Sequence, residues 1–93
     1  MTVNASECAV TVVNRRGLHA RAAAKVATLA ERFTAELVVT FEDQSVSARS
    51  ILGLMMLGAG QNAQLLLAAT GPDAATALGA LHTLITSGFN EDI

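Results

Sequence analysis

The sequence predicts an α+β fold, an open-faced β-sandwich with a four-stranded antiparallel sheet and three helices on one face, in the order βαββαβα. Short β-branched stretches of alternating polarity are interleaved with stretches whose apolar residues recur at helical spacing. Alternate strand positions are small or polar, so the helices should cover one sheet face and leave the other to water. The length of 93 residues predicts a single domain spanning 1–93. Because 18 residues are alanine and 3% are aromatic, we expect a core built by close approach of backbones.

The first half of the chain should form a strand, a helix and a hairpin. Residues 8–13 are β-branched and alternating, and they include Cys8, which we expect to be a buried small hydrophobe. Residues 20–32 have apolar positions spaced by four, three and four, which is typical of an amphipathic helix. The alternation resumes in 36–41, and a polar turn then leads into a short strand at 45–48.

The second half should form a short helix, a strand and a last helix. Ser50 is a good N-cap and Gly58 a good terminator for the short helix. Residues 63–70 are expected to form the fourth strand. The segment Gly71–Asp73 then places proline in the first turn of the last helix and an aspartate near its positive end, and that helix should stop at Gly88.

The charge distribution is uneven. The formal net charge of −2 argues against nucleic-acid binding, because phosphate contacts need a surplus of cations. All six Lys and Arg lie between Arg15 and Arg49, and five of them lie within Arg15–Arg32. We therefore expect a local positive field around one short segment.

Other features narrow the class of protein. Cys8 is the single cysteine, so no internal disulfide is expected, and with two distant histidines it forms no pattern of metal ligands. The uncharged stretch Ser50–Pro72 is interrupted in its middle by glycine and polar residues, so membrane insertion is not expected. Met1–Glu7 lacks the basic start and apolar run of a signal peptide, which predicts a cytoplasmic protein.

The segment Gly17–Arg21 is the strongest candidate site. It joins a flexible glycine, a histidine at a helix start and an arginine two residues later. The first amides of a helix lack partners and the helix dipole is positive there, which suits a phosphoryl group. The dipole and Arg21 should keep His19 uncharged and therefore nucleophilic. Two alternatives are that His19 is simply a cap residue, or that the loop belongs to a small regulatory domain that binds an anion without covalent phosphorylation.

The short helix that follows Ser50 is apolar nearly all round. Such a helix is either covered by a partner or packed under neighbouring loops, and both readings stay open. Ser50 is likewise either an N-cap alone or also a regulatory phosphosite, whose added charge would spoil an adjacent apolar contact surface.

Two motifs resemble a known family. Gly17-Leu-His-Ala-Arg21, and Ser50-Ile-Leu-Gly-Leu-Met-Met-Leu-Gly58 at its proper distance, resemble HPr, the histidine-containing phosphocarrier of the bacterial phosphoenolpyruvate-dependent phosphotransferase system. The resemblance covers nearly the whole chain. The ending Ser87-Gly-Phe-Asn-Glu-Asp92 resembles the nitrogen-related branch of the family, which is similar to NPr and signals rather than imports sugar.

The resemblance implies roles for the first motif. His19 would accept a phosphoryl group on Nδ1 from phospho-Enzyme I and pass it to an EIIA-type protein. Arg21 and the backbone at Ala20 would bind the phosphoryl group and stabilise the transfer transition state. The group would derive from phosphoenolpyruvate with no bound cofactor or metal, on a monomer that is a transfer intermediate rather than a stand-alone enzyme. The chain departs from the family at Ala22, where proline is usual, and Asn14 is assigned no role.

The resemblance also implies roles for the second motif. Ser50 matches the serine that HPr kinase/phosphorylase modifies in organisms that possess this enzyme. Ile51, Leu52 and Met55 match the hydrophobic surface on which partner proteins dock.

Overall fold

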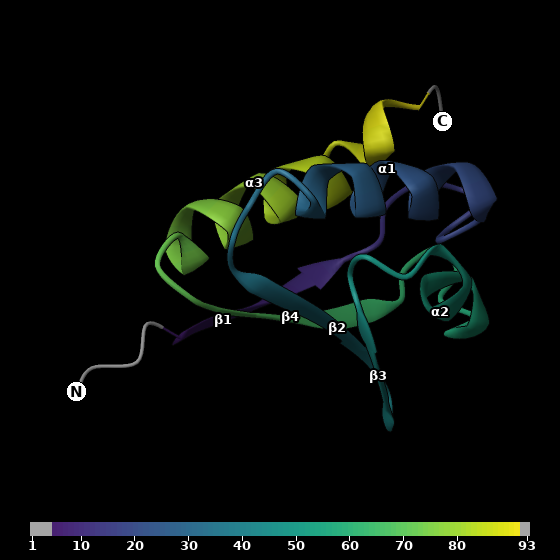
Figure 1. The fold of residues 1–93 in the computed structure, drawn as a ribbon. Helices are drawn as coiled ribbons and strands as arrows, with labels where there is room; N and C mark the ends of the chain where they lie inside the picture. The colour runs from purple at the N-terminus through teal and green to yellow at the C-terminus, as the bar shows by residue number, and fades with distance from the viewer. Residues whose placement is uncertain (1–4, 92–93) are drawn as a thin grey trace.

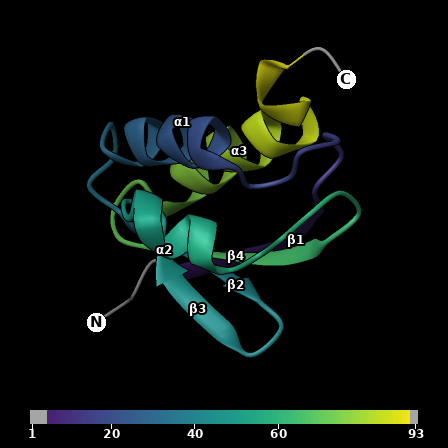
Figure 2. The ribbon, with the colours of Figure 1, turned by 90° about the vertical axis from the view of Figure 1, so that its right-hand side faces the viewer.

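The computed structural model describes residues 5–91. In chain order the elements are β1 (Ala5–Thr11), α1 (Ala20–Ala30), β2 (Glu36–Phe41), β3 (Gln44–Ser47), α2 (Ile51–Met56), β4 (Gln64–Thr70), α3 (Ala74–Thr86) and the 3₁₀ turn η1 (Gly88–Asn90). The four strands form one antiparallel sheet in the order β1-β4-β2-β3. Helices α1 and α3 lie together over one face of the sheet, and α2 covers the β2–β3 end of the same face (Figures 1 and 2). The predicted α+β architecture is confirmed.

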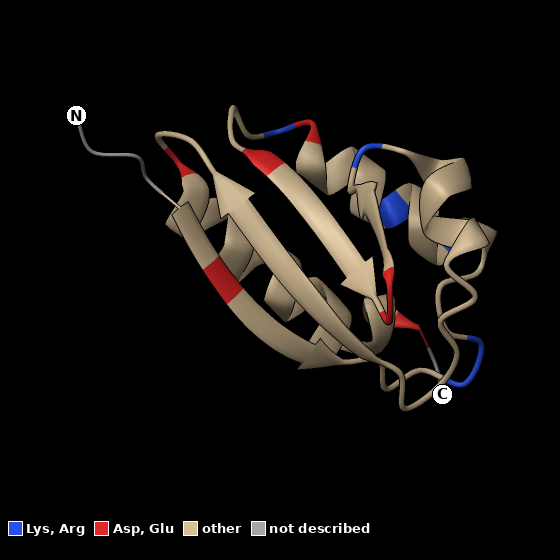
Figure 3. Ribbon diagram, turned by 90° about the horizontal axis from the view of Figure 1, so that it is seen from below, with Lys and Arg blue, Asp and Glu red and all other residues tan. Residues whose placement is uncertain are grey.

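Strand β4, one of the two interior strands, packs its buried side against the helices. Leu67 is fully buried on the helical side and pairs with Cys8 on one neighbour and Val39 on the other. The next residue, Leu66, faces the opposite way and is exposed. Seen from that opposite side, the sheet carries no helix, and its strands bear acidic but no basic residues (Figure 3). The predicted division into a covered and a wet face therefore holds.

Small residues bring the helices close to the sheet, as the composition predicts. Ala22 and Ala23 of α1 and Ala77 of α3 have no exposed surface. Cys8 differs from expectation, because it packs against the core but is half-buried near the sheet edge. Burial raises the pKa of the Cys8 thiol.

Several element boundaries differ from prediction. Strand β1 begins earlier, at Ala5, and ends at Thr11 rather than at residue 13. Helix α1 ends at Ala30, and the η1 turn was not predicted. No helix within residues 5–91 has the length and apolar content that crossing a membrane requires.

The two later helices begin differently. Ser50 is the N-cap of α2, as predicted, and its Oγ accepts a hydrogen bond from the Gly53 amide at 2.9 Å. Pro72 precedes α3 rather than lying in its first turn, and the Asp73 carboxylate does not bond to its own helix. The two Asp73 oxygens instead accept the amides of Thr34 and Ala35, at 2.9 and 2.7 Å. Asp73 therefore joins the start of α3 to the loop that leads into β2.

These contacts favour the ionised carboxylate. The hydrogen bond from the Thr34 amide lowers the pKa of Asp73 most; burial opposes it, and the Ala35 amide and the charge of Arg49 add to the lowering. The pKa of Asp73 in the folded protein therefore lies below its ordinary value.

We expect Asp73→Asn to lower the thermal unfolding midpoint by several degrees at pH 7. A lowered folded pKa stabilises the fold above the unfolded pKa of about 3.9, and this contribution is lost as the pH falls through the folded pKa. Thermal unfolding from pH 7 down to pH 2 should thus show the gap between wild type and variant closing at low pH. Asp43→Asn, in the exposed turn between β2 and β3, is the matched control and should show no such gap. A gap that stays constant with pH would contradict this role of Asp73.

Candidate functional site

The loop before α1 is held in place by a glycine. Gly17 has φ of +64°, and a Cβ at this position would collide with the carbonyl oxygen of Ala59. The next amide, that of Leu18, donates to the same carbonyl at 2.9 Å. This close approach of two loops requires glycine and fixes where His19 enters the helix.

His19 is the N-cap residue of α1. Its backbone is extended, with φ −76° and ψ 178°, and its carbonyl accepts the first helical hydrogen bond, from Ala23, at 2.9 Å. Its ring Nδ1 accepts the amide of Arg21 at 3.3 Å. The cap interpretation and the candidate-site interpretation of His19 therefore describe the same geometry, with Nδ1 facing the first amides of the helix.

The other ring nitrogen meets a carboxylate. His19 Nε2 lies 2.5 Å from Glu91 Oε2, and the two side chains are 13% and 16% exposed. An ionised carboxylate can only accept, so the proton of this bond resides on Nε2. Nδ1, which accepts the Arg21 amide, is then the nitrogen that carries the lone pair. The lone pair of Nδ1 therefore faces the start of α1.

Asn14 holds Glu91 in position. Its side chain is buried, and Nδ2 donates to Glu91 Oε1 and to the Gly17 carbonyl, both at 3.0 Å. Its Oδ1 has no hydrogen-bond partner among residues 5–91. One amide group thereby links the loop before α1 to the C-terminal segment.

The C-terminal segment is anchored next to the site. Phe89 is fully buried although its backbone is in the left-handed region, with φ of 58°. A conformation of this kind costs on the order of 1–3 kcal/mol in a bulky residue, and burial of the ring offsets it. Lys25 Nζ donates to the Phe89 carbonyl at 2.5 Å. These contacts place Glu91 two residues later beside His19.

The predicted cations gather beside the site, together with one carboxylate. A cavity of about 390 Å³ beside the site is lined by Arg16, Arg21, Lys25, Asn90 and Glu91. Burial raises the pKa of Glu91, but hydrogen bonds from His19 and Asn14 and the charge of Lys25 outweigh it, so this pKa lies below its ordinary value. An ionised carboxylate thus lies among the predicted cations and contacts the ring, an addition that the sequence analysis did not anticipate.

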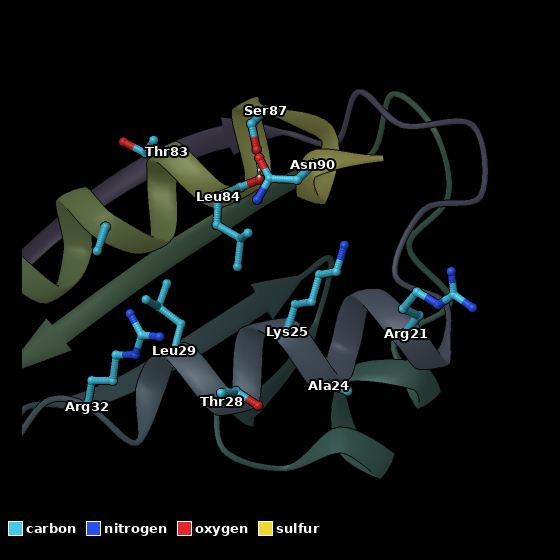
Figure 4. Close-up of a pocket in the computed structure, with 11 residues that line it drawn as sticks. Arg21, Ala24, Lys25, Thr28, Leu29, Arg32, Thr83, Leu84, Ser87 and Asn90 are labelled. Carbon is cyan, nitrogen blue, oxygen red and sulfur yellow. Dashed lines mark hydrogen bonds between the residues drawn. The ribbon is translucent and has the colours of Figure 1, made fainter. Parts of the chain in front are cut away.

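Arg21 is exposed, and its guanidinium extends outward from the start of α1 (Figure 4). Its backbone amide, rather than its side chain, contacts the ring. The guanidinium is therefore accessible to solvent and lines the cavity beside the site.

Helix α2 presents an apolar surface. Leu52 and Met56 are 70% and 72% exposed, and Ile51 and Met55 are 43% and 40% exposed, whereas Leu54 is fully buried. Neighbouring loops therefore do not cover the surplus apolar residues. Ser50 at the start of this helix is also exposed. Across the described part of the chain, no three His, Cys, Asp or Glu side chains gather as a group that could hold a metal ion.

Comparison with known proteins decides the family. The family model described as "PTS HPr component phosphorylation site" matches residues 6–87. The chain belongs to the PTS HPr family of phosphocarrier proteins. It is 44% identical over 82 residues to phosphocarrier protein NPr of Shewanella violacea, covering 88% of this chain and 90% of the relative. It is 42% identical to phosphocarrier protein HPr of Cupriavidus necator, covering 87% and 91% of the two chains.

The fold agrees with a solved HPr structure. The crystal structure of HPr-C-His from Thermoanaerobacter tengcongensis superposes with a TM-score of 0.90 at 38% identity, covering 95% of this chain and 99% of that one. The resemblance predicted from the two motifs is thus confirmed along nearly the whole chain.

Sequence reasoning missed two residues of this HPr-family site. Asn14 was assigned no role, and Glu91 was noted only as part of a resemblance in the chain ending, whose last residue, Asp92, lies outside the described residues. The sequence offered one indication for Asn14, which is a polar residue that lies between a β-branched strand and Gly17. No local pattern marks Glu91, which meets Asn14 from 77 positions away.

We expect Glu91→Ala to abolish the low-field proton resonance of His19 Nε2, because the variant removes the acceptor that shields this proton from exchange. ¹H–¹⁵N NMR of the imidazole nitrogens measures it directly. Glu31→Ala, which removes an exposed carboxylate at the other end of α1, is the matched control and should keep the resonance. Persistence of the signal in Glu91→Ala would show that Glu91 does not hold the ring in solution.

Proposed function

We propose that this protein is a phosphocarrier that accepts a phosphoryl group on His19 Nδ1 from phospho-Enzyme I and passes it to an EIIA-type protein. The observation that carries the proposal is the Nε2–H bond to Glu91 at 2.5 Å, which leaves the Nδ1 lone pair at the helix N-terminus. In the first transfer the bond from phosphorus to the donor atom of Enzyme I breaks as the Nδ1–phosphorus bond forms. In the second transfer the Nδ1–phosphorus bond breaks as a bond forms between phosphorus and the acceptor atom of the EIIA-type protein, and His19 is left as a neutral ring.

Glu91 assists this exchange without moving a proton. Attack through Nδ1 while Nε2 keeps its hydrogen leaves a positive charge on the ring. The Glu91 carboxylate accepts from Nε2–H and stabilises that charge. Asn14 keeps the carboxylate in place through its 3.0 Å bond to Oε1.

The phosphoryl oxygens have donors nearby. The first hydrogen bond within the helix comes from the Ala23 amide, so the amides of Ala20 and Arg21 before it have no partner within the helix. These two amides can donate to the oxygens of an approaching phosphoryl group. The 3.3 Å bond from the Arg21 amide to Nδ1 is long, and this amide can turn to a phosphoryl oxygen once phosphorus occupies Nδ1. The Arg21 guanidinium adds bidentate stabilisation. Ala22 in place of the usual proline removes no donor and continues the helix.

Incubation with phosphoenolpyruvate and Enzyme I should place an acid-labile, base-stable phosphoryl group on wild-type protein. His19→Ala should carry none, whereas His82→Ala, on α3, should be labelled normally. Mass spectrometry of the intact protein at neutral pH measures the label. Absence of label on wild type would favour the alternative, a small regulatory domain that binds anions without covalent chemistry in its cationic cavity.

The same assay tests Arg21. Arg21→Ala should accept the group about 10²–10³-fold more slowly, the usual effect of removing one group that stabilises transition-state charge. Arg15→Ala is the control for net charge, since Arg15 lies in the loop before the site, and should transfer at nearly the wild-type rate. Equal rates for the two variants would remove Arg21 from the mechanism.

We further propose that Enzyme I and the EIIA-type protein dock on α2 through Ile51, Leu52 and Met55, and that phosphorylation of Ser50 weakens this docking. The exposure of these three side chains next to an exposed serine supports the proposal. Where HPr kinase/phosphorylase is present, a phosphate on Ser50 would add negative charge at the edge of the apolar surface.

Ser50→Asp should reduce the rate of phosphoryl acceptance from Enzyme I about tenfold, equivalent to about 1.4 kcal/mol of docking. Aspartate is itself a good N-cap, so α2 should stay folded. Ser45→Asp, on β3, adds the same charge away from α2 and should leave the rate unchanged. An unaltered rate in Ser50→Asp would mean that Ser50 serves as a helix cap alone.

The proposal extends to the location of the protein, its oligomeric state and the source of its phosphoryl group. We place the protein in the cytoplasm as a monomeric transfer intermediate, carrying a group that originates in phosphoenolpyruvate and needing no bound cofactor. The resemblance of its C-terminal segment to the nitrogen-related branch, and its 44% identity to an NPr, support a signalling role.

A further inference from the structure

A groove between α1 and α3 lies on the outer side of the helical layer, away from the sheet. The groove is open to solvent on one side and measures about 640 Å³, within the range of roughly 300–1,000 Å³ typical of small-molecule sites. Leu29 of α1 and Leu84 of α3 point into the space between the two helices (Figure 4). Ala24 and Ala80 line the groove as well, and their small side chains leave room between the helices. These four side chains form an apolar stretch of the groove, whose lining also includes the uncharged polar residues Thr28, Thr83, Ser87 and Asn90.

The groove is cationic at its rim. Arg21, Lys25 and Arg32 line it, and no Asp or Glu does so among the described residues. This concentration of positive charge occurs in a chain whose net charge is −2. Lys25 uses one of its three donors on the Phe89 carbonyl and keeps two, while Arg32 is exposed beyond the end of α1. An apolar groove with cations at its rim is complementary to a molecule that is apolar along its body and anionic at one end.

We propose that this groove binds a small amphipathic organic anion. Its apolar body lies between Leu29 and Leu84, and its carboxylate, sulfonate or phosphate pairs with Arg32 or Lys25. The site is distinct from the apolar surface of α2, because residues 50–58 carry no charge and offer an anion no partner. It shares Arg21 with the site at His19, but His19 itself does not line the groove, and Nδ1 faces the first amides of α1.

The test uses 8-anilinonaphthalene-1-sulfonate as the probe and the full chain in ¹H–¹⁵N NMR titrations. Saturable shifts should map to amides of α1 and α3 that line the groove. N-phenyl-1-naphthylamine, the same ring system without the sulfonate, should bind about tenfold more weakly, because it cannot form a charge-assisted bond with the rim. Equal affinity of the two probes would overturn the proposal.

Matched variants locate the site. Arg32→Gln should weaken binding of the sulfonate about tenfold, whereas Arg15→Gln, which changes the net charge equally outside the groove, should change it less than about twofold. Leu84→Gln should also weaken binding, and Leu52→Gln, on α2, should not. The exposed position of Arg32 keeps the test informative if Leu84→Gln fails to fold. Equal effects of the two arginine variants, or loss of binding in Leu52→Gln with retention in Leu84→Gln, would place the probe elsewhere and refute the groove.

Discussion

The hydrogen bond between His19 Nε2 and Glu91 Oε2 is the constraint on which the site depends. A carboxylate on one ring nitrogen determines which nitrogen holds the proton, and thus which one carries the lone pair. Under the proposed transfer it would also supply negative charge where the ring becomes positive on phosphorylation. The helix N-terminus acts on the opposite nitrogen, where donors suit an incoming anion. The two ends of one imidazole therefore meet environments of opposite sign.

Most of the surrounding architecture serves to bring Glu91 to that ring. The buried ring of Phe89 and the bond from Lys25 to its carbonyl fix the C-terminal segment against α1. Asn14 joins the segment to the loop before the helix, and Gly17 allows that loop to approach the neighbouring one. Since each of these contacts links segments distant in sequence, the site forms only when the whole sheet-and-helix layer has assembled.

Features that depend on neighbouring residues could be predicted from the sequence, whereas contacts between distant segments could not. The loop Gly17–Arg21 and the cap at Ser50 are contiguous motifs, whose structure depends on residues next to one another in the sequence. The alternation of apolar and polar residues identifies the strands in the same way. The fold and the position of the His19 ring at the start of a helix were therefore predictable. The pairing of Asn14 with Glu91 was not, because it depends on the path of the chain after α3. The helix ends before Gly88, as predicted, and Gly88 has a φ of 69°. The chain then turns through the left-handed backbone of Phe89, a conformation that its residue type disfavours and that tertiary packing imposes.

The position of the C-terminal segment has a practical consequence. Glu91 is the last residue that the structure describes and it contacts the imidazole, so a bulky group fused close behind it would lie near the ring. The described N-terminal end, at Ala5, lies at the far end of the molecule from the start of α1 (Figure 1). Fusions at the amino terminus are therefore the arrangement that leaves the chemistry undisturbed.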